Sequence, residues 1–339
     1  MPRPPTCRSR LARLVVALLL PAALSLPAQA QNADAPSLRE RIQARIAQRK
    51  EAPAAEPAAI TRPGDYSFSF EHGGATRQYR VHVPASYRDD TPRPLLLVFH
   101  GGGGNMDIQA DDRYYGQISQ AEQAGYIVAF PNGYSRFGGK LATWNAGHCC
   151  GGARDTQSDD VGFVREVVAR LKRQLNIDAQ RIFASGISNG AMMSYRLACE
   201  MPDTFRAIAA VAGTDNTTVC TPSRPVSILH IHARDDELVL FNGGAGRESD
   251  KVTAFVSVPD SIAKWVKLDA CRPAPQRVLS TAGAYCEAYT GCQGGTQVQL
   301  CVTESGGHSW PGGQKPRGGS QPSSAIKATE LIWDFFAQQ

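Results

Sequence analysis

Short apolar runs alternate with segments of helical periodicity from Gly64 to the end of the chain. Residues 95–99, Leu-Leu-Leu-Val-Phe, are apolar at every position, as in a parallel strand that is buried on both faces. After Asp159, apolar residues recur with the period of a helix, and Asp159 stands where a helix-capping side chain is expected. Strands are predicted at residues 78–83, 95–100, 126–130, 181–184, 207–211, 226–231 and 296–302, and helices at 159–175, 189–200, 258–268 and 324–336.

This alternation of strands and helices is typical of an α/β protein with a mostly parallel central sheet. Hydrophobic residues make up 42% of the chain, which is enough for a buried core and too many for a disordered protein. No internal repeat interrupts the pattern, so we predict one domain over residues 64–339. Residues 31–63 precede it as an amphipathic helix over 37–51 and an Ala/Pro-rich linker, which form either a spacer or a helix docked on the domain.

The first thirty residues have the composition of a secretory signal peptide. Arginines up to Arg13 precede an apolar run over residues 14–26, and Ala28-Gln29-Ala30 supplies a small-residue cleavage site. The apolar run is shorter than the roughly 20 residues of a membrane-spanning helix, and a buried N-terminal helix is the alternative. We therefore predict cleavage after Ala30 and a secreted protein, extracellular or periplasmic, without a membrane anchor.

The formal charge of +5 lies almost entirely in this signal segment, which holds four arginines and no acidic residue. The remaining chain is close to neutral. A neutral surface gives no electrostatic reason to bind nucleic acid, so that class of partner is excluded.

Export to an oxidising compartment gives the cysteines a structural role. Removal of Cys7 with the signal leaves eight, an even number that allows up to four disulfides. Zinc binding is the alternative, but the chain has no C-x-x-C pair and two of the cysteines are adjacent. The cysteines form two groups, and we expect pairing within each group with the connectivity left open. The groups are Cys149, Cys150, Cys199 and Cys220, and Cys271, Cys286, Cys292 and Cys301.

Residues 186–190 read Gly-Ile-Ser-Asn-Gly, the G-x-S-x-G pattern of a nucleophile elbow. A predicted strand precedes this pattern and a predicted helix follows it, which is the context that the strained turn needs. The turn would present the Ser188 hydroxyl above the sheet, and the N-terminus of the helix would stabilise negative charge on the substrate oxygen. A tight structural turn is the alternative.

A glycine-rich loop from His100 to Asn105 follows the most hydrophobic strand. Glycine allows a substrate to approach the backbone, whose N–H groups can donate to an anionic oxygen. We assign an oxyanion hole to the N–H groups of Gly102 and Asn189. A phosphate-binding loop is excluded because no Lys-Ser/Thr pair follows the glycines, and a flexible structural loop is the alternative.

A serine needs a base to accept its proton, and His308 is the candidate. It lies in a Gly-rich loop between the last predicted strand and the last predicted helix, and it follows Ser188 in the chain order Ser–Asp–His that accompanies a G-x-S-x-G elbow. The acid would come from the loop after strand 226–231, where Asp235 and Asp236 are adjacent. Its carboxylate would fix the histidine tautomer and stabilise the imidazolium.

Two further pairs of side chains near these motifs have more than one interpretation. His230 and His232 lie on one face of the same predicted strand. Their spacing is compatible with metal ligands, but we favour a packed or hydrogen-bonded pair and expect no metal or organic cofactor. Trp144 and Trp310 lie in Gly-containing loops, where an aromatic side chain could line a substrate cleft.

These motifs resemble, in order, those of the secreted esterase family that includes polyhydroxybutyrate depolymerases and feruloyl esterases. They read HGGGGN, TWNAG-x-CCG, DDVGFV, GISNGAMMSYRLACE, LHIHARDDELV and GGHSWPGG, and the resemblance covers residues 64–336. It implies the α/β-hydrolase fold, with Ser188 as nucleophile, Asp236 as acid, His308 as base and Gly102 in the oxyanion hole.

The same resemblance marks where this chain differs from the family. Ala233 and Glu237 stand where family members often have Gly and Pro, beside the proposed acid. Cys286 and Cys301 are additional to the family's cysteines, which suggests that these two pair with each other.

Motifs and resemblance together predict a secreted serine carboxylic-ester hydrolase that acts through an acyl-enzyme. The substrate expected first is a polyhydroxyalkanoate-type polyester or oligomer. A feruloyl or acetyl esterase of plant cell-wall polysaccharide is the alternative, and a non-catalytic binding protein on a hydrolase fold is a third interpretation. We expect a monomer whose partner is an ester substrate, polymeric or small.

Overall fold

The computed structural model describes residues 37, 39, 41, 58–246, 254–316 and 321–339. From residue 58 onward these belong to one compact unit, Pro57–Gln339. The predicted signal peptide lies outside the described residues. Of the predicted helix over 37–51, only Ser37, Arg39 and Arg41 are described, and the Arg41 N–H donates to the Ser37 carbonyl at 2.9 Å, as in a helical turn.

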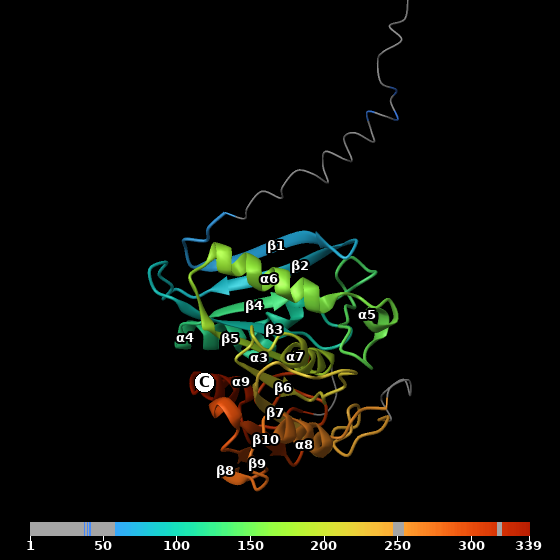
Figure 1. Ribbon diagram of the computed structural model, residues 1–339, viewed down its shortest axis with the longest axis vertical. Coiled ribbons are helices and arrows are strands. Elements are labelled where there is room, and N and C mark those ends of the chain that lie inside the picture. Colours follow the sequence, from blue (N-terminus) through green and yellow to red (C-terminus); the bar gives the residue numbers. More distant parts are fainter. Residues whose placement is uncertain (1–36, 38, 40, 42–57, 247–253, 317–320) are drawn as a thin grey trace, which may run out of the picture. The chain divides into compact units, whose positions relative to one another are not determined.

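A ten-stranded sheet runs through this unit in the order β1-β2-β4-β3-β5-β6-β7-β10-β9-β8 (Figure 1). Neighbouring strands are parallel from β4 to β10, and antiparallel strands extend the sheet at both edges. The strands are β1 (Gly64–His72), β2 (Ala75–Val83), β3 (Arg93–Phe99), β4 (Ile127–Pro131), β5 (Ile177–Ile187), β6 (Ala207–Val211), β7 (Ser227–Ala233), β8 (Gln276–Thr281), β9 (Ala284–Tyr289) and β10 (Val298–Thr303).

The apolar run in β3 shows why the sheet is buried on both faces. Leu95, Leu97 and Phe99 belong to one core cluster, whereas Leu96 and Val98 belong to the other. Successive side chains of a strand point to opposite faces, so a run without polar residues can fill two cores at once. The prediction of a mostly parallel α/β sheet is confirmed.

Helices cover the two faces of the sheet. Side chains of α6 (Asp160–Gln174), α7 (Asn189–Glu200) and α8 (Val258–Leu268) fill the first core, and those of α4 (Gln117–Ala124) and α9 (Ala328–Ala337) fill the second. Asp159 caps α6 as predicted, because its side chain accepts from the Gly162 N–H at 2.9 Å. The shorter helices are α2 (Met106–Gln109), α3 (Asp112–Tyr115), α5 (Gly151–Asp155) and the 3-10 turn η1 (Gln293–Gly295).

The structure adds elements that the apolar pattern did not predict. Strands β1, β8 and β9 and the short helices α2 to α5 were not expected. Residues 58–63, read as linker, include Ile60, which is buried and donates its N–H to the Gln174 carbonyl at 2.8 Å. The packed body of the protein therefore begins before Gly64.

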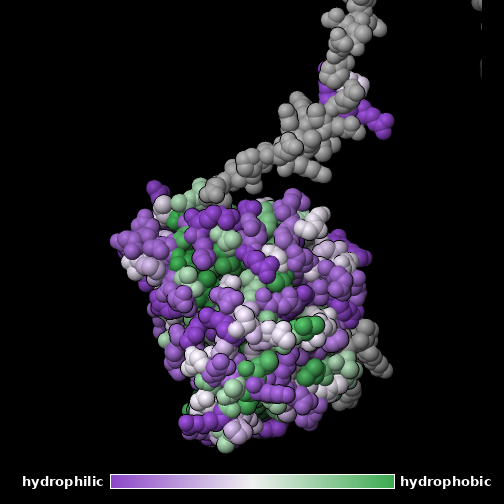
Figure 2. Space-filling view, viewed as in Figure 1, coloured by the Kyte–Doolittle hydropathy of each residue, from purple (hydrophilic) through white to green (hydrophobic). Residues whose placement is uncertain are grey.

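Four disulfides join the cysteines within the two predicted groups. They are Cys149–Cys150, Cys199–Cys220, Cys271–Cys292 and Cys286–Cys301, the last as the family resemblance suggested. Figure 2 shows one face of the unit, where hydrophilic residues dominate and apolar ones are scattered. Among the described residues, no helix has both the length and the apolar character needed to span a bilayer.

Candidate active site

The predicted site residues follow four parallel strands at the same edge of the sheet. His100 comes directly after β3, Ser188 after β5, Asp236 three residues after β7, and His308 in the loop after β10. Carboxyl ends of parallel strands lie on one side of a sheet, so residues far apart in the chain meet there.

Ser188 occupies the sharp turn between β5 and α7. Its backbone has φ 56° and ψ −123°, a conformation that residues other than glycine rarely adopt. Its N–H donates to the Val211 carbonyl at 2.8 Å, which fixes the turn on β6. A Cβ atom at Gly190 would lie 2.1 Å from the Phe99 carbonyl oxygen, so only glycine allows α7 to approach β3 this closely.

The glycine loop after β3 is held from below by His100, which is almost completely buried. The His100 Nδ1 lies 2.8 Å from the Gly101 carbonyl, and its Nε2 accepts from the Gly133 N–H at 3.0 Å. Burial lowers the pKa of His100 to about 4, so the ring is neutral at pH 7. His100 therefore fixes the conformation of the loop, and a hydrogen bond from the Gly103 N–H to the Ala142 carbonyl at 2.8 Å stabilises it further.

Trp144 lies behind this loop and not in a cleft. The side chain is fully buried, and its indole N–H donates to the His100 carbonyl at 3.0 Å. The expectation that Trp144 lines a substrate cleft is therefore corrected: the apolar ring fills the core beside Phe99. Asn189 ties the two loops together, since its amide group exchanges hydrogen bonds with the Trp144 backbone N–H (2.7 Å) and carbonyl (3.0 Å).

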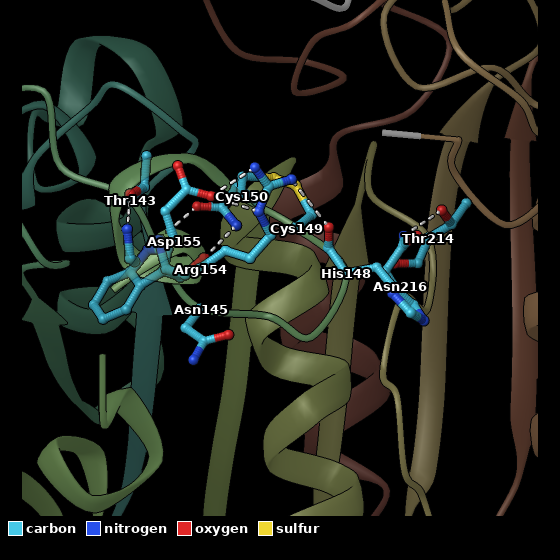
Figure 3. The surroundings of a disulfide bond; sticks show 12 residues. Thr143, Asn145, His148, Cys149, Cys150, Arg154, Asp155, Thr214 and Asn216 are labelled. Carbon is cyan, nitrogen blue, oxygen red and sulfur yellow. Dashed lines mark hydrogen bonds and ion pairs between the residues drawn. A yellow bond between two sulfur atoms is a disulfide. The ribbon is translucent and has the colours of Figure 1, made fainter. Parts of the chain in front are cut away.

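The segment after Trp144 contains the adjacent pair Cys149–Cys150 (Figure 3). The Cys150 N–H donates to the Trp144 carbonyl at 3.0 Å, and the His148 N–H donates to Asn216 at 3.0 Å. These two hydrogen bonds hold the loop that contains Trp144, the hydrogen-bond partner of Asn189.

Asp236 and His308 form a hydrogen-bonded pair in the site. His308 Nδ1 lies 2.8 Å from Asp236 Oδ2, and the second carboxylate oxygen accepts from the N–H groups of Leu238 and Val239, each at 2.9 Å. Burial alone would raise the pKa of Asp236, but the hydrogen bonds from His232 and His308 outweigh it and hold the pKa well below its usual value. The carboxylate is therefore ionised at neutral pH.

The neighbouring Asp235 has a contact that the sequence did not predict. Its carboxylate accepts from the N–H groups of Gly306 (3.3 Å) and Gly307 (2.8 Å), in the loop that carries His308. The two adjacent aspartates therefore contact the same loop, one through its backbone and one through the imidazole. In the sequence, the adjacent pair Asp235-Asp236 is the signal for these contacts, but it does not show which aspartate binds the backbone and which binds His308.

A cavity of about 370 Å³ opens between these elements, and both Ser188 and His308 line it. Its walls are mixed, with Trp310 among the apolar residues and Gln314 and Lys315 among the polar ones. The Trp310 indole N–H donates to Thr329 at 2.9 Å. Ile108 and Tyr115 come from the region of the short helices, which hydrophobic periodicity did not reveal. The apolar lining residues are Ile108, Tyr115, Ile187, Leu238, Trp310 and Pro316.

Comparison with known proteins places the chain in a family. A family model described as "Putative esterase" matches residues 72–277, more than half of the chain. The chain belongs to this esterase family. Feruloyl esterase B of Piromyces equi is 31% identical over 69% of this chain, and the match covers 42% of that relative's length. Feruloyl esterase D of Neurospora crassa is 26% identical over 78% of this esterase and 83% of the relative.

A solved structure shows the same fold. Acetyl xylan esterase from Aspergillus awamori superposes with a TM-score of 0.52 at 14% sequence identity, over 78% of this chain and 94% of that one. The esterase therefore has the α/β-hydrolase fold, as the resemblance implied.

Proposed function

We propose that the esterase hydrolyses carboxylic esters with Ser188 as nucleophile, His308 as general base and Asp236 as the acid that orients His308. The Ser188 oxygen attacks the ester carbonyl carbon while His308 Nε2 takes the hydroxyl proton. The N–H groups of Gly102 and Asn189 donate to the oxyanion. The intermediate then expels the alcohol, which receives the proton from His308, and water releases the acid from the acyl-enzyme by the same steps.

The observation that carries this proposal is the 2.8 Å contact between Asp236 and His308 Nδ1, beside a cavity that Ser188 also lines. A hydrogen on Nδ1, donated to a carboxylate, leaves Nε2 unprotonated and able to accept from a hydroxyl. The strained turn at Ser188 and the glycine loop beside it support the same assignment. Four disulfides also support the proposal that the esterase is secreted, because such bonds persist in oxidising compartments.

For the substrate we propose feruloyl esters of plant polysaccharide. The relatives named above are feruloyl esterases, and the solved neighbour is an acetyl xylan esterase. Aromatic and aliphatic walls formed by Tyr115, Trp310 and Ile108 suit a planar aromatic acyl group. These observations favour feruloyl esters over the polyester substrate that the sequence motifs led us to expect first.

Parallel assays test both levels of the proposal. The wild-type protein and Ser188→Ala are incubated with methyl ferulate, acetylated xylan and polyhydroxybutyrate film, and released acids are quantified. We expect hydrolysis of methyl ferulate to exceed that of the other substrates, and Ser188→Ala to lose it. Undiminished activity in Ser188→Ala would exclude the mechanism, whereas faster release of hydroxybutyrate would restore the polyester substrate. Failure of an organophosphonate probe to label Ser188 would favour a non-catalytic binding protein.

A further inference from the structure

Asp236 has hydrogen-bond partners that lead away from the cavity into the core. Behind its carboxylate, His232 Nε2 lies 2.8 Å from the Val239 carbonyl oxygen and 3.4 Å from Asp236 Oδ2. His230 Nε2 lies 3.1 Å from His232 Nδ1, and the Tyr195 hydroxyl lies 2.8 Å from His230 Nδ1. Tyr195, His230 and His232, which we call the buried histidine chain, are all at most 1% exposed.

The partners determine the position of each hydrogen in the buried histidine chain. A carbonyl oxygen only accepts, so His232 Nε2 carries the hydrogen that the Val239 carbonyl receives. In a neutral ring His232 Nδ1 is then an acceptor, and His230 Nε2 donates to it. His230 Nδ1 in turn accepts from the Tyr195 hydroxyl. The chain therefore runs in one direction, from the tyrosine to the turn that holds Asp236.

The charge states of Tyr195 and His230 fit this order. Burial, and the neighbouring His232, lower the pKa of His230 well below its ordinary value. Burial raises the pKa of Tyr195 well above its ordinary value. Both side chains are therefore neutral at pH 7. The planes of the His230 and His232 rings are nearly parallel, 3° apart with 5.2 Å between centroids, which is compatible with an in-plane N–H···N contact between the two rings.

His232 acts on the carboxylate through the backbone. The Val239 N–H donates to Asp236 Oδ1, and the Val239 carbonyl accepts from His232, so one residue links the histidine to the aspartate. The His232 N–H also approaches Asp236 Oδ2, the oxygen that contacts His308. A change in the His232 tautomer would replace a donor by a lone pair facing two acceptors, which would displace the turn.

We propose that His232 is a positioning residue for the Asp236–His308 pair, and that His230 and Tyr195 hold it in the tautomer this position requires. The inference rests on the proposed function, because it assigns a role to side chains that lie behind the reacting groups. Tyr195, His230 and His232 are not among the residues that line the cavity.

Nitrogen NMR tests the tautomers without reference to activity. In the full chain labelled with ¹⁵N-histidine at pH 7, we expect His230 and His232 each to carry one hydrogen, on Nε2, with an unprotonated Nδ1. In Tyr195→Phe, which removes one hydroxyl and keeps the ring, we expect the His230 resonances to shift because its Nδ1 loses its donor. A hydrogen on His232 Nδ1 in the wild-type protein would overturn the proposal.

Kinetics then test the positioning role. In metalloenzymes, loss of an outer hydrogen bond that orients a catalytic histidine commonly lowers activity by about 10- to 100-fold. We expect kcat to fall by a similar factor in His232→Leu, with KM almost unchanged. His232→Gln keeps a donor near the Nε2 position and should restore most of kcat. The low-field proton resonance of His308 Nδ1–H should move in the leucine variant and return in the glutamine variant.

Two further variants keep the test decisive if His232→Leu does not fold. Tyr195→Phe should lower kcat in the same direction by a smaller factor. Tyr126→Phe is the matched control, because it removes a buried hydroxyl from the other core cluster, where Tyr126 stacks on Trp333. Equal kcat values in Tyr195→Phe, Tyr126→Phe and wild type, with an unmoved His308 resonance, would refute the positioning role.

The proposed function and the positioning role of His232 can fail separately. If Ser188→Ala retains full ester hydrolysis, the proposed function fails. If Ser188→Ala is inactive but His232→Leu keeps its kcat and its low-field resonance, only the positioning role fails.

Discussion

Asp235 and Asp236 are adjacent but have different hydrogen-bond partners, so substitution of each should lower kcat to a different extent. Asp236→Asn keeps the side-chain shape but replaces one acceptor oxygen by an amide, so His308 would be held in the wrong tautomer. We expect kcat for an ester substrate to fall by about 10⁴-fold, the size of the loss in triad enzymes with this substitution.

Asp235→Asn is the matched control for that substitution. Its carboxylate contacts only backbone N–H groups of Gly306 and Gly307 among its hydrogen bonds in the described residues, and asparagine retains one acceptor. Hydrogen bonds to charged groups are worth about 1.5–3 kcal/mol, or about 10- to 150-fold, so the loss of kcat in Asp235→Asn should stay within that range. Comparable losses of kcat in Asp235→Asn and Asp236→Asn would contradict the assignment of Asp236 as the acid.

At the scale of single residues, the sequence provides candidates for the site but not their surroundings. The motifs selected Ser188 and His308, and the family resemblance selected Asp236 over Asp235. They misplaced Trp144, because a tryptophan between polar and glycine residues gives no periodicity from which burial can be read. The contact of His232 with Val239 was equally hidden, since it depends on how the loop after β7 turns back on the strand.

The elbow shows how two elements constrain one glycine. A Cβ atom at Gly190 would lie 2.1 Å from the Phe99 carbonyl oxygen and 2.6 Å from that of His100. Gly190→Ala must therefore separate α7 from β3, and we expect it to lower the free energy of unfolding by about 1–3 kcal/mol, the usual cost of overpacking.

Chemical denaturation measures this cost, with Gly102→Ala as the control. The nearest atom to a Cβ at Gly102 is the Asn189 Cβ at 3.6 Å, an ordinary contact distance. Gly102→Ala should therefore unfold at nearly the same denaturant concentration as the wild type. An equal midpoint for both variants would show that β3 and α7 tolerate separation.

The C-terminus of α8 offers a prediction about pH. Asp269 caps this helix in a buried position, where its carboxylate accepts from the Val226 N–H at 3.3 Å. Burial raises the pKa of Asp269 to about 7, against about 4 in an unfolded chain. Between these values the folded protein binds the proton more tightly, so this group makes stability fall as pH rises from about 4 to about 7.

Asp269→Asn should remove this dependence, because the amide is neutral and still offers an acceptor to Val226. We expect a higher melting temperature than wild type at pH 8 and little difference near pH 4, as thermal unfolding across that range would show. Asp260→Asn is the control, since Asp260 is exposed in the first turn of the same helix. Parallel pH curves for wild type and Asp269→Asn would contradict the prediction.

Elements with a continuous apolar pattern could be predicted, and those built by alternation or capping could not. β3 and β6 appear as uninterrupted apolar runs, and α6 has both a period and a capping aspartate. β1 alternates half-buried and exposed positions along GDYSFSFEH, so the pattern was present but weaker than a buried run. The four-residue helices α2 and α3 are too short for any period, which is why hydrophobic periodicity does not indicate the cavity residues Ile108 and Tyr115.

For the whole molecule, the order of the strands determines what can meet. The chain places the elbow after β5, near the middle of the sheet, while the acid and the base come from β7 and β10, which are adjacent and parallel although about seventy residues separate them. No local pattern encodes that pairing. The pairing forms only when β10, the last parallel strand, adds to β7. The position of His308 beside Asp236 therefore depends on the stability of β10 in the sheet.

The disulfide between Cys286 and Cys301 supports that last part of the sheet. The two residues lie directly opposite each other on β9 and β10, and both are fully buried. Closing a loop of 15 residues restricts the unfolded chain by about 3 kcal/mol in the chain-entropy model. We expect the double variant Cys286→Ala, Cys301→Ala to lose about that much unfolding free energy in denaturant titration.

Ester hydrolysis by the folded double variant should be unchanged, because neither cysteine lines the cavity. The double variant Cys199→Ala, Cys220→Ala is the comparison. Its bridge closes 21 residues, which has a similar entropic effect, but it joins the end of α7 to the loop after β6 and does not involve β10. If the Cys286–Cys301 bridge also maintains the register that brings His308 to Asp236, the variant without it should lose activity well below its own unfolding midpoint. The variant without Cys199–Cys220 should lose activity only at its midpoint. If both variants lose activity at their unfolding midpoints, the sheet opens as one cooperative unit.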